Sequence, residues 1–375
     1  MAKIFIDASA LASSKPSGVA YANTNTIIEL AEVLKGTDKK IILLATSDTK
    51  TLPDKITAMP NVTVRKLPIS ARVLRLISRL PFMIPLDLFL GRGIYLFMNF
   101  YNFPVRSKSI TFIYDVSFLI FPETIQPKNL KFFNNNMRKW VRRTDVVVTP
   151  TETSKKEIIE HLGVAPEKIL ALPVPLGDEF KRSSETEIQD AKSRYNLPEK
   201  YILYLGNIEP RKNLANLVAA FAKSETAKTG ISLLVVGADT WKAERIQAVI
   251  DSARKQGAKI ANPSKFVENT DLPAVISGAD FLALPSIHEG FGVPPTQALA
   301  CGTPVLVSDI PVLHEVLGNA AHYMDPNNVD DMAAQIDKMT DFVKNSGLKS
   351  PQADFLRYNE SKVQKILDEI VQDKI

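Results

Sequence analysis

The sequence has 375 residues, 45% of them apolar and 23% charged, which is the balance of an ordinary soluble globular protein. This length exceeds what a single hydrophobic core usually spans, so two domains are expected. The net charge of +5 and the pI near 9.0 fit an anionic partner. Nucleic acid is not the expected partner, because the chain has no zinc-finger spacing, aromatic ribonucleoprotein motif or long basic run.

The sequence predicts a cytoplasmic protein. No apolar run reaches the roughly 18 residues of a membrane span. The start, MAKIFIDASA, has no charged region followed by an apolar signal core. The single cysteine, Cys301, excludes an internal disulfide and lies in a turn of small residues, which favours a packing role.

The first half alternates predicted strands and helices. The strand Lys3–Asp7 leads into the loop ASALASSKPSGVAYA and then into a helix that begins near Val19. Gly18, just before this helix, allows backbone N–H groups to face a diphosphate. A glycine is also common in the β-α loop of any Rossmann-like domain, so both interpretations stay open. Further strands are expected at KIILLAT, VTVRKL, GIYLFMN, ITFIYDV and DVVVTP.

The segment between Arg72 and Leu80 has helical spacing, and Pro81 ends it. One face is apolar and another is basic, formed by Val73, Leu76, Ile77 and Leu80 and by Arg72, Arg75 and Arg79. With the apolar FMIPLDLFLG that follows, such a helix is able to rest on an anionic membrane surface and meet a lipid-linked acceptor. In a simpler interpretation, which we favour, the apolar face packs on the sheet and the arginines face water.

Tyr114 and Asp115 follow the apolar part of a predicted strand, in ITFIYDV. In an open parallel sheet the ligand crevice lies beyond the carboxyl ends of the strands, so these side chains are candidates for ligand contact. Tyr114 is our choice for the wall of an acceptor site. The alternative is a tyrosine at a strand end whose hydroxyl bonds the backbone.

Two more helices are predicted before the first domain ends. A basic helix runs from about Pro127 to Arg143, and TETSKKEIIEHLG forms a helix capped by Thr151 or Thr153 and closed by Gly163. The strand ILALPVPLG then ends the first domain, and the polar DEFKRSSETEIQD is a linker.

The second half begins with a buried strand that leads through Gly206 and Asn207 to the pair Arg211 and Lys212. Asn213 is placed to cap the next helix. Two cations at a helix start oppose the helix dipole, so a purely structural role for them is disfavoured. Beyond the carboxyl end of a strand they form an anion clamp, in which arginine supplies a planar fork and lysine a point charge.

The stretch FLALPSIHEGFGVPPTQALACGTPVLVSD, from Phe281 to Asp309, reads as a strand, a Gly-rich turn, a short helix and a second strand. Gly290 and Gly292 allow close approach of a ligand to the backbone and to the start of the helix. Glu289, just before them, repels phosphate but accepts hydrogen bonds from hydroxyls. The combination indicates a ligand with both groups, such as a nucleotide or a nucleotide sugar.

These residues resemble the nucleotide-sugar signature of glycosyltransferase family 4, the retaining enzymes of GT-B fold. In that family a glutamate, seven residues and a second glutamate flank the turn. Glu289 matches the first, which lies near the transferred sugar. Gln297 stands at the second, which binds the ribose hydroxyls, and an amide is also able to bond a ribose. Tyr114 stands where the family has a histidine, and it cannot carry charge near neutral pH as histidine does.

The resemblance also implies the fold and the site. It predicts an α/β protein of GT-B fold, with two Rossmann-like domains whose parallel sheets face a central cleft. The acceptor domain is residues 1–180, the nucleotide-sugar domain is residues 181–350, and a helix over 351–375 crosses back to the first domain. The predicted catalytic residues are Glu289, Arg211, Lys212 and Tyr114, and the donor-binding residues are Gly18, Gly206, Asn207, Val267, His288, Gly290, Phe291, Gly292 and Gln297.

The predicted function is transfer of a hexose, mannose or a similar sugar, from a nucleoside diphosphate sugar to a hydroxyl of a glycan or lipid-linked acceptor. No D-x-D sequence occurs, so we expect transfer without a metal and without any other cofactor, at the cytoplasmic side of a membrane. The alternative is a GT-B shell that binds a nucleotide or glycan, or partners another transferase, without catalysis. Tyr114 and Gln297 favour this alternative, and the retained Arg211, Lys212 and Glu289 oppose it. A nucleotide-sugar epimerase is a further, weaker alternative.

Overall fold

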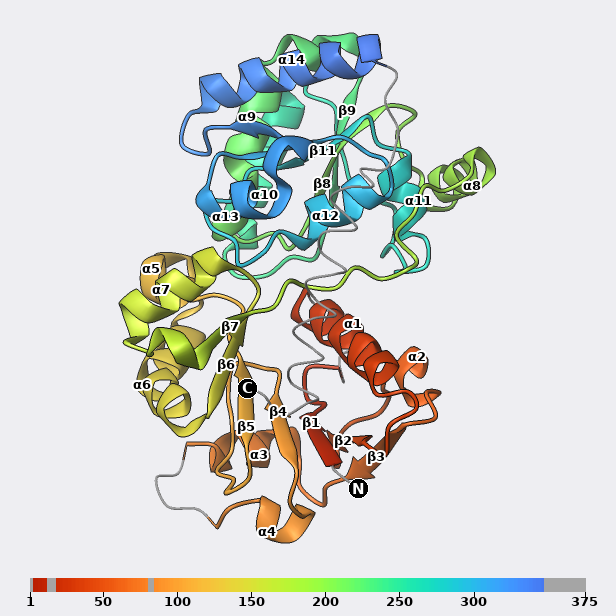
Figure 1. Cartoon of the computed structure of the whole chain (residues 1–375). Coiled ribbons are helices and arrows are strands. Elements are labelled where there is room, and N and C mark those ends of the chain that lie inside the picture. The colour runs from red at the N-terminus through yellow and green to blue at the C-terminus, as the bar shows by residue number, and fades with distance from the viewer. Residues whose placement is uncertain (1–2, 12–17, 80–83, 347–375) are drawn as a thin grey trace. The chain divides into compact units, whose positions relative to one another are not determined.

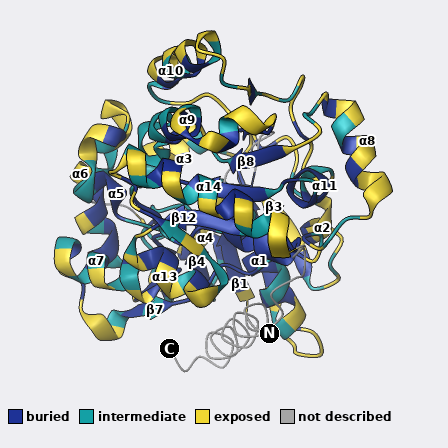
Figure 2. Ribbon diagram, turned by 90° about the horizontal axis from the view of Figure 1, so that it is seen from above, coloured by how far each residue is buried: buried dark blue, intermediate teal, exposed yellow. Residues whose placement is uncertain are grey.

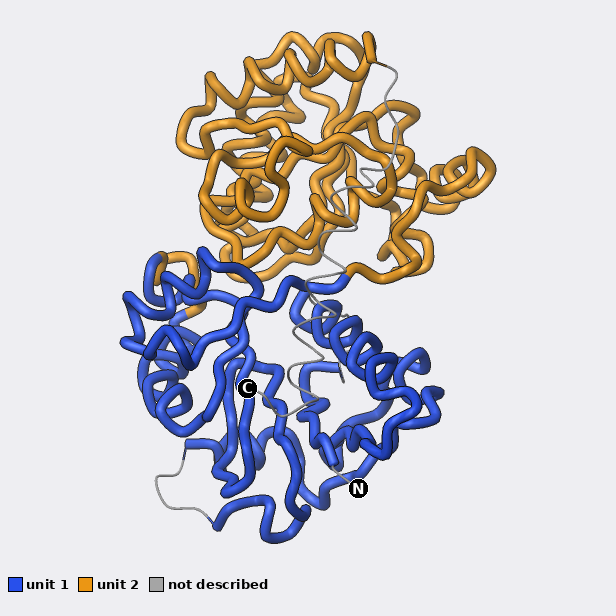
Figure 3. Tube along the Cα trace, in the orientation of Figure 1, with its two compact units in different colours: residues 1–120, 127–175, 358–375 blue, residues 121–126, 176–357 orange. Residues whose placement is uncertain are grey.

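The computed structural model describes residues 3–11, 18–79 and 84–346 (Figure 1). The described residues form two compact units (Figure 3). Unit 1 holds those within 1–120 and 127–175, and unit 2 holds those within 121–126 and 176–357. The predicted helix over 351–375 lies outside the described residues.

Unit 1 is built on a parallel sheet whose strands occur in the order β3-β2-β1-β4-β5-β6-β7. Its strands are rich in Ile, Leu, Val and Phe because helices cover a parallel sheet on both faces. The chain first adds strands on one side of β1 and then returns to add β4 on the other side. The strands are β1 (Lys3–Asp7), β2 (Lys40–Ala45), β3 (Val62–Lys66), β4 (Ile94–Phe97), β5 (Ser109–Phe112), β6 (Val146–Thr149) and β7 (Ile169–Ala171).

The helices of unit 1 pack on this sheet and bury a core that includes Ile6, Ile27, Leu43 and Leu96. Thr151 accepts a hydrogen bond from the amide of Ser154 and caps α7, as the sequence predicts. The helices are α1 (Gly18–Val33), α2 (Asp54–Thr57), α3 (Ala71–Ile77), α4 (Asp87–Leu90), α5 (Ser117–Ile120), α6 (Pro127–Arg143) and α7 (Glu152–Leu162).

The predicted amphipathic helix forms as α3, but the favoured interpretation of its apolar face is wrong. Leu74 is buried, whereas Val73 and Leu76 are 41% and 58% exposed. The remaining residues of the predicted stripe are Ile77, which is half-buried, and Leu80, which lies outside the described residues. The apolar stripe therefore faces solvent to a large extent.

The arginines of this segment explain the orientation of α3. The guanidinium carbon of Arg79 lies 4.7 Å from the ring centroid of Phe132, and that of Arg75 lies 5.9 Å from the same centroid and 6.0 Å from that of Tyr101. Cations over aromatic rings are attracted by the ring quadrupole. The basic side chains thus cover the aromatic rings, and the apolar ones are left outside.

Unit 2 repeats the arrangement with the strand order β10-β9-β8-β11-β12-β13, again parallel throughout. Its direction of growth reverses between β8 and β11. Strands β8 and β12 are drawn as buried in Figure 2. The strands are β8 (Tyr201–Leu205), β9 (Ser232–Val236), β10 (Ile260–Ala261), β11 (Phe281–Leu284), β12 (Val305–Ser308) and β13 (His322–Met324).

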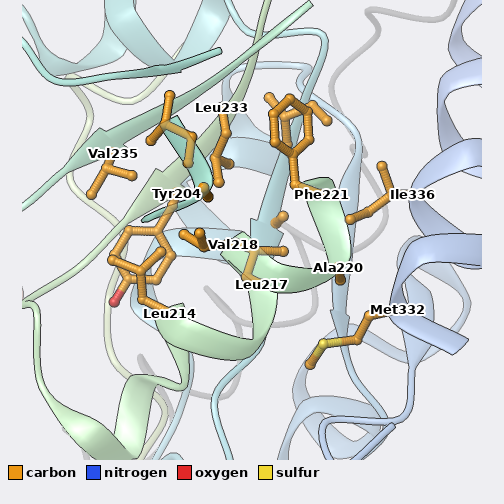
Figure 4. Packing of buried hydrophobic residues seen from close by; sticks show 14 of the residues in the cluster. Tyr204, Leu214, Leu217, Val218, Ala220, Phe221, Leu233, Val235, Met332 and Ile336 are labelled. Atoms are coloured by element: carbon orange, nitrogen blue, oxygen red, sulfur yellow. The ribbon is translucent and has the colours of Figure 1, made fainter. Parts of the chain in front are cut away.

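The core of unit 2 lies between the sheet and the helices α9 and α14. Leu217, Val218 and Phe221 of α9 are fully buried against Leu233, and Met332 and Ile336 of α14 close the same cluster (Figure 4). Among the described residues no helix is long and apolar enough to cross a membrane. The helices are α8 (Glu185–Tyr195), α9 (Leu214–Lys223), α10 (Ala243–Lys255), α11 (Leu272–Ser277), α12 (Val293–Ala300), α13 (Pro311–Leu317) and α14 (Val329–Ser346).

The turns after β8 and β9 touch through two glycines. Gly206 follows β8 and Gly237 follows β9, and a Cβ added to Gly237 would lie 1.8 Å from the carbonyl oxygen of Gly206. A backbone carbonyl cannot move aside as the end of a flexible side chain can. Gly237 is therefore required for the close approach that sets the course of the chain toward Arg211.

We predict that Gly237→Ala lowers the free energy of unfolding by about 3 kcal/mol, because the new methyl group overlaps backbone. The matched control is Gly18→Ala, since a Cβ at Gly18 meets nothing within 4 Å, and its effect is expected within about 0.5 kcal/mol. Urea unfolding followed by circular dichroism measures both. Equal effects of the two substitutions would contradict the assignment.

Candidate functional site

The candidate site of unit 2 lies where the order of its sheet reverses. Ligands of open α/β sheets bind beyond the carboxyl ends of the two strands at such a switch point. Here those strands are β8 and β11, and they end at Leu205 and Leu284. The loop after β8 carries Arg211 and Lys212, and the loop after β11 carries Glu289. The topology thus brings the two predicted motifs together.

An ion cluster of Glu289, Lys212, Arg211 and Glu209 joins the two loops. Lys212 Nζ lies 2.6 Å from Glu289 Oε1, and Arg211 Nη1 lies 3.5 Å from Glu289 Oε2. Arg211 Nη1 also donates to the backbone carbonyl of His288 at 2.7 Å, and Arg211 Nη2 lies 3.0 Å from Glu209 Oε1. The guanidinium fork is therefore fixed from two sides while the lysine meets Glu289 as a point charge.

The cluster is buried from water. The side chains of Glu289, Lys212 and Arg211 are 7%, 12% and 15% exposed. Burial opposes ionisation of Glu289, but the charges of Lys212 and Arg211 and the Lys212 hydrogen bond hold the pKa of this carboxyl below its ordinary value. Glu289 is thus an anion at neutral pH, and it faces two cations in a poorly solvated place.

Asn213 has a different role from the one that the sequence predicts. It occupies the position before α9, but its side chain makes no capping hydrogen bond and its backbone is left-handed, with φ of 57°. Its amide Nδ2 donates instead to the carbonyls of Pro285 and Pro326, at 3.0 and 2.8 Å. Ile287 N also donates to the carbonyl of Arg211. These bonds fasten the loop after β8 to the loop after β11.

The Gly-rich turn ends at the start of α12, as predicted. Gly292 has φ of +93°, a backbone conformation that favours glycine. A Cβ there would also lie 2.7 Å from Leu313 Cδ2. Gln297 is buried on α12, 5% exposed. Its place on the helix that follows Gly292 keeps it close in sequence to the turn, and its expected ribose contact stays a prediction.

The other predicted donor-binding residues of unit 2 lie in three different loops. His288 and Phe291 are buried on either side of Glu289 and Gly290 in the same turn. Asn207 follows Gly206 after β8, and its carbonyl accepts the hydroxyl of Tyr204 at 2.9 Å. Val267 is buried in the loop between β10 and α11.

Two predicted site residues, Gly18 and Tyr114, belong to unit 1. Gly18 is the first residue of α1, and most of the loop before it lies outside the described residues. Tyr114 follows β5, and its hydroxyl donates to Asn23 Oδ1 on α1, while Asn23 Nδ2 donates to the carbonyl of Met98 at 2.7 Å. Burial raises the pKa of Tyr114, so this hydroxyl remains neutral and is bonded by a side chain rather than by backbone.

Sequence analysis missed a polar cluster at the switch point of unit 1, between β1 and β4. Both carboxylate oxygens of Asp7 accept hydrogen bonds from Ser9, whose hydroxyl lies 2.8 Å from that of Tyr101 and accepts from Asn99. Burial raises the pKa of Asp7 to about 6, against the opposing bonds from Ser9. The position of Asp7 at the carboxyl end of the first strand was the signal that could have identified this cluster.

Cys301 is buried, and burial raises the pKa of its thiol to about 12, as its predicted packing role requires. Among the described residues, no group of three or more His, Cys, Asp or Glu side chains is placed to hold a metal ion.

Comparison with known proteins supports the interpretation of unit 2. Residues 185–345 match the model of the family described as Glycosyl transferases group 1. The O-antigen chain mannosyltransferase B of Escherichia coli is 27% identical over 241 residues, which are 64% of this chain and 62% of that protein. The chain therefore spans less than two thirds of the length of this relative. The predicted resemblance to group 1 glycosyl transferases is therefore found over residues 185–345.

Two solved structures resemble almost the whole chain. The sucrose-phosphate synthase of Thermosynechococcus elongatus superposes with a TM-score of 0.73 at 15% identity and covers 99% of both chains. Anabaena HepE in complex with UDP and glucose superposes with a TM-score of 0.67 at 15% identity and covers 100% of this chain and 99% of its own. The fold is that of the GT-B glycosyltransferases. The predicted pair of Rossmann-like domains with parallel sheets is confirmed, and unit 2 of this GT-B chain carries the ion cluster.

We predict that Glu289→Gln lowers the free energy of unfolding at pH 7 by about 3 kcal/mol, because it leaves the buried Lys212 without its anion and Arg211 with Glu209 alone. The folded-state pKa of Glu289 is depressed, so its contribution is present above the ordinary value of 4.5 and is lost as the pH falls through the folded-state pKa. Urea unfolding between pH 7 and pH 3 therefore shows wild type and variant converging toward acid.

The matched control for this experiment is Glu199→Gln. Glu199 pairs with Lys192 but is 78% exposed, and exposed pairs contribute little. Its expected effect at pH 7 is below about 0.5 kcal/mol. A constant difference between wild type and Glu289→Gln over the whole pH range would contradict a stabilising role for the Glu289 carboxylate.

Proposed function

We propose that the chain is a retaining glycosyltransferase of family 4. It transfers a hexose, mannose or a similar sugar, from a nucleoside diphosphate sugar to a hydroxyl of a glycan or lipid-linked acceptor, without a metal ion or other cofactor. The observation that carries the proposal is the buried Glu289 held by Lys212 and Arg211 at the switch point of unit 2. The similarity to a mannosyltransferase favours mannose, and the HepE complex contains UDP and glucose.

The chemical task of such an enzyme is to stabilise the leaving diphosphate. Negative charge grows on the diphosphate as the bond to the sugar breaks, and fixed cations in a poorly solvated place stabilise that charge strongly. Lys212 and Arg211 have this character, because they are buried and fixed by Glu289, Glu209 and a carbonyl. At the start of α12, Val293 has a backbone N–H for the same charge, whereas Pro294 and Pro295 have none.

Glu289 has a complementary task in this proposal. A carboxylate next to a diphosphate is repelled by it, but it accepts hydrogen bonds from the hydroxyls of the transferred sugar. The cations that hold Glu289 are shared with the diphosphate, so donor binding redistributes their bonds between two anions. Glu289 thereby orients the sugar, and Gln297 bonds the ribose.

The transfer step requires no nucleophile from the enzyme. The bond between the anomeric carbon and the diphosphate oxygen breaks, and the acceptor oxygen forms a new bond to the anomeric carbon on the same face. The acceptor proton passes to the oxygen of the leaving diphosphate. The configuration is therefore retained. This front-face course rests on the resemblance to family 4.

We also propose that the chain works at the cytoplasmic face of a membrane, in peripheral contact with it. A lipid-linked acceptor requires such contact. Tyr114 would then form part of the acceptor wall in unit 1, as a neutral hydroxyl bonded to Asn23.

We predict that the wild-type protein, incubated with the correct nucleoside diphosphate hexose and no acceptor, slowly releases the free sugar. Lys212→Met is expected to slow this hydrolysis by about 100-fold or more, because one fixed donor to the developing charge is lost. Lys200→Met, at an exposed lysine just before β8, should hydrolyse as wild type does. Anion-exchange chromatography measures nucleoside diphosphate release.

Other outcomes identify the alternatives. A donor that binds but is not hydrolysed favours the non-catalytic binding module. A donor whose sugar changes configuration while the nucleotide stays attached favours an epimerase.

A further inference from the structure

The large exposed apolar side chains are concentrated in one stretch of unit 1. Seven such residues are exposed in the part of the chain that the structure describes, and five of them lie between Val73 and Phe89. A monomeric protein seldom exposes neighbouring apolar side chains without a partner for them. These five are Val73, Leu76, Ile84, Leu88 and Phe89, which are 41%, 58%, 62%, 54% and 67% exposed.

Arginines accompany the apolar residues of both helices. On the segment of α3, Arg72, Arg75 and Arg79 are exposed. At α4, Arg65 of β3 donates to the carbonyls of Phe89 and Leu90, at 3.1 and 2.9 Å. We call the five apolar residues together with these four arginines the α3–α4 surface. Figure 1 draws α3 and α4 in the same lower part of unit 1.

Helix α6 extends the positive charge next to α3. Lys139 Nζ donates to the carbonyl of Arg79 at 2.6 Å, and the indole of Trp140 donates to the carbonyl of Ser78 at 3.2 Å. Neither the segment 71–79 nor α6 contains an acidic residue. The basic residues of α6 are Lys128, Lys131, Arg138, Lys139, Arg142 and Arg143.

The arginines of α3 are held in place rather than extended freely into water. Arg75 and Arg79 lie over the ring of Phe132, and they stand in the same segment as the exposed Val73 and Leu76. The acidic group that contacts α3, Asp48, accepts from the amide of Ala71 at the beginning of the helix. Asp87 of α4 is buried and accepts from the amides of Arg106 and Ser107, so apart from Asp48 the exposed charges beside the apolar side chains are those of the arginines.

We propose that the α3–α4 surface docks on a bilayer that contains anionic phospholipid. The apolar side chains enter the boundary between headgroups and acyl chains, and the arginines meet the phosphates. Apolar side chains mixed with Lys and Arg, without acidic residues, are the pattern of interfacial binding.

Flotation of the full chain with lipid vesicles tests the proposal. Vesicles of phosphatidylcholine containing 30% phosphatidylglycerol are compared with vesicles of phosphatidylcholine alone, at two salt concentrations. We expect stronger binding to the anionic vesicles, weakened by salt because surface charge is screened within about 10 Å at 0.1 M. Arg72→Gln should reduce the partition coefficient by about fivefold, since each basic residue near such a surface contributes about that factor.

The apolar part is tested by Leu76→Ser with Phe89→Ser, which should reduce binding to the anionic vesicles by at least tenfold. The matched control is Phe266→Ser, at an apolar residue of unit 2 that is 49% exposed. It should bind as wild type does. Circular dichroism of each variant confirms that it is folded.

The proposal is overturned if wild type binds neither kind of vesicle, or if Phe266→Ser loses as much binding as the double variant. Binding that resists both substitutions would also overturn it, because another surface of the chain would then hold the bilayer. Donor hydrolysis is measured on the same variants without vesicles. It should be unchanged, so a failure of membrane docking and a failure of the transferase function remain distinguishable.

Discussion

The buried contact of Glu289 with Lys212 and Arg211 is the interaction on which the candidate site depends. A carboxylate with 7% exposure is costly unless cations and hydrogen bonds compensate it, and here both come from the loop after a neighbouring strand. The same cations are the groups that a diphosphate needs. The contact is therefore a structural link between two loops, and in the proposed function its cations also bind the diphosphate.

The sheet order and the course of the backbone bring Glu289 next to Lys212 and Arg211. Strands β8 and β11 are neighbours only because the chain reverses its direction of growth between them, so the two loops emerge side by side. Asn213 then joins the loops through two carbonyls, Gly237 allows a backbone approach that a Cβ would prevent, and Gly292 adopts a positive φ. Unit 1 shows the same reversal between β1 and β4, with the Asp7 cluster at that point.

The sequence predicts much of this because its signals are local. Apolar runs and capping residues define β8, β11 and α7, and the motifs around Arg211, Lys212 and Glu289 predict residues that the structure brings together. Contacts between residues far apart in the sequence are harder to predict from it. Asn213 resembles a helix cap in sequence but bonds Pro285 and Pro326, and Val73 faces outward because Arg75 and Arg79 cover Phe132. Such outcomes depend on tertiary partners that periodicity does not reveal.

Thermal unfolding with added nucleotides tests most directly whether the cluster binds a diphosphate. GDP, UDP, ADP and dTDP, their hexose conjugates and the bare nucleosides are compared for wild type and Lys212→Met, without metal and with magnesium. One nucleoside diphosphate family at about 100 times its dissociation constant should stabilise wild type by about 2.7 kcal/mol, independently of magnesium. Its nucleoside should bind far more weakly, and Lys212→Met should lose most of the effect. An unchanged response of Lys212→Met, or none from wild type, would contradict the account.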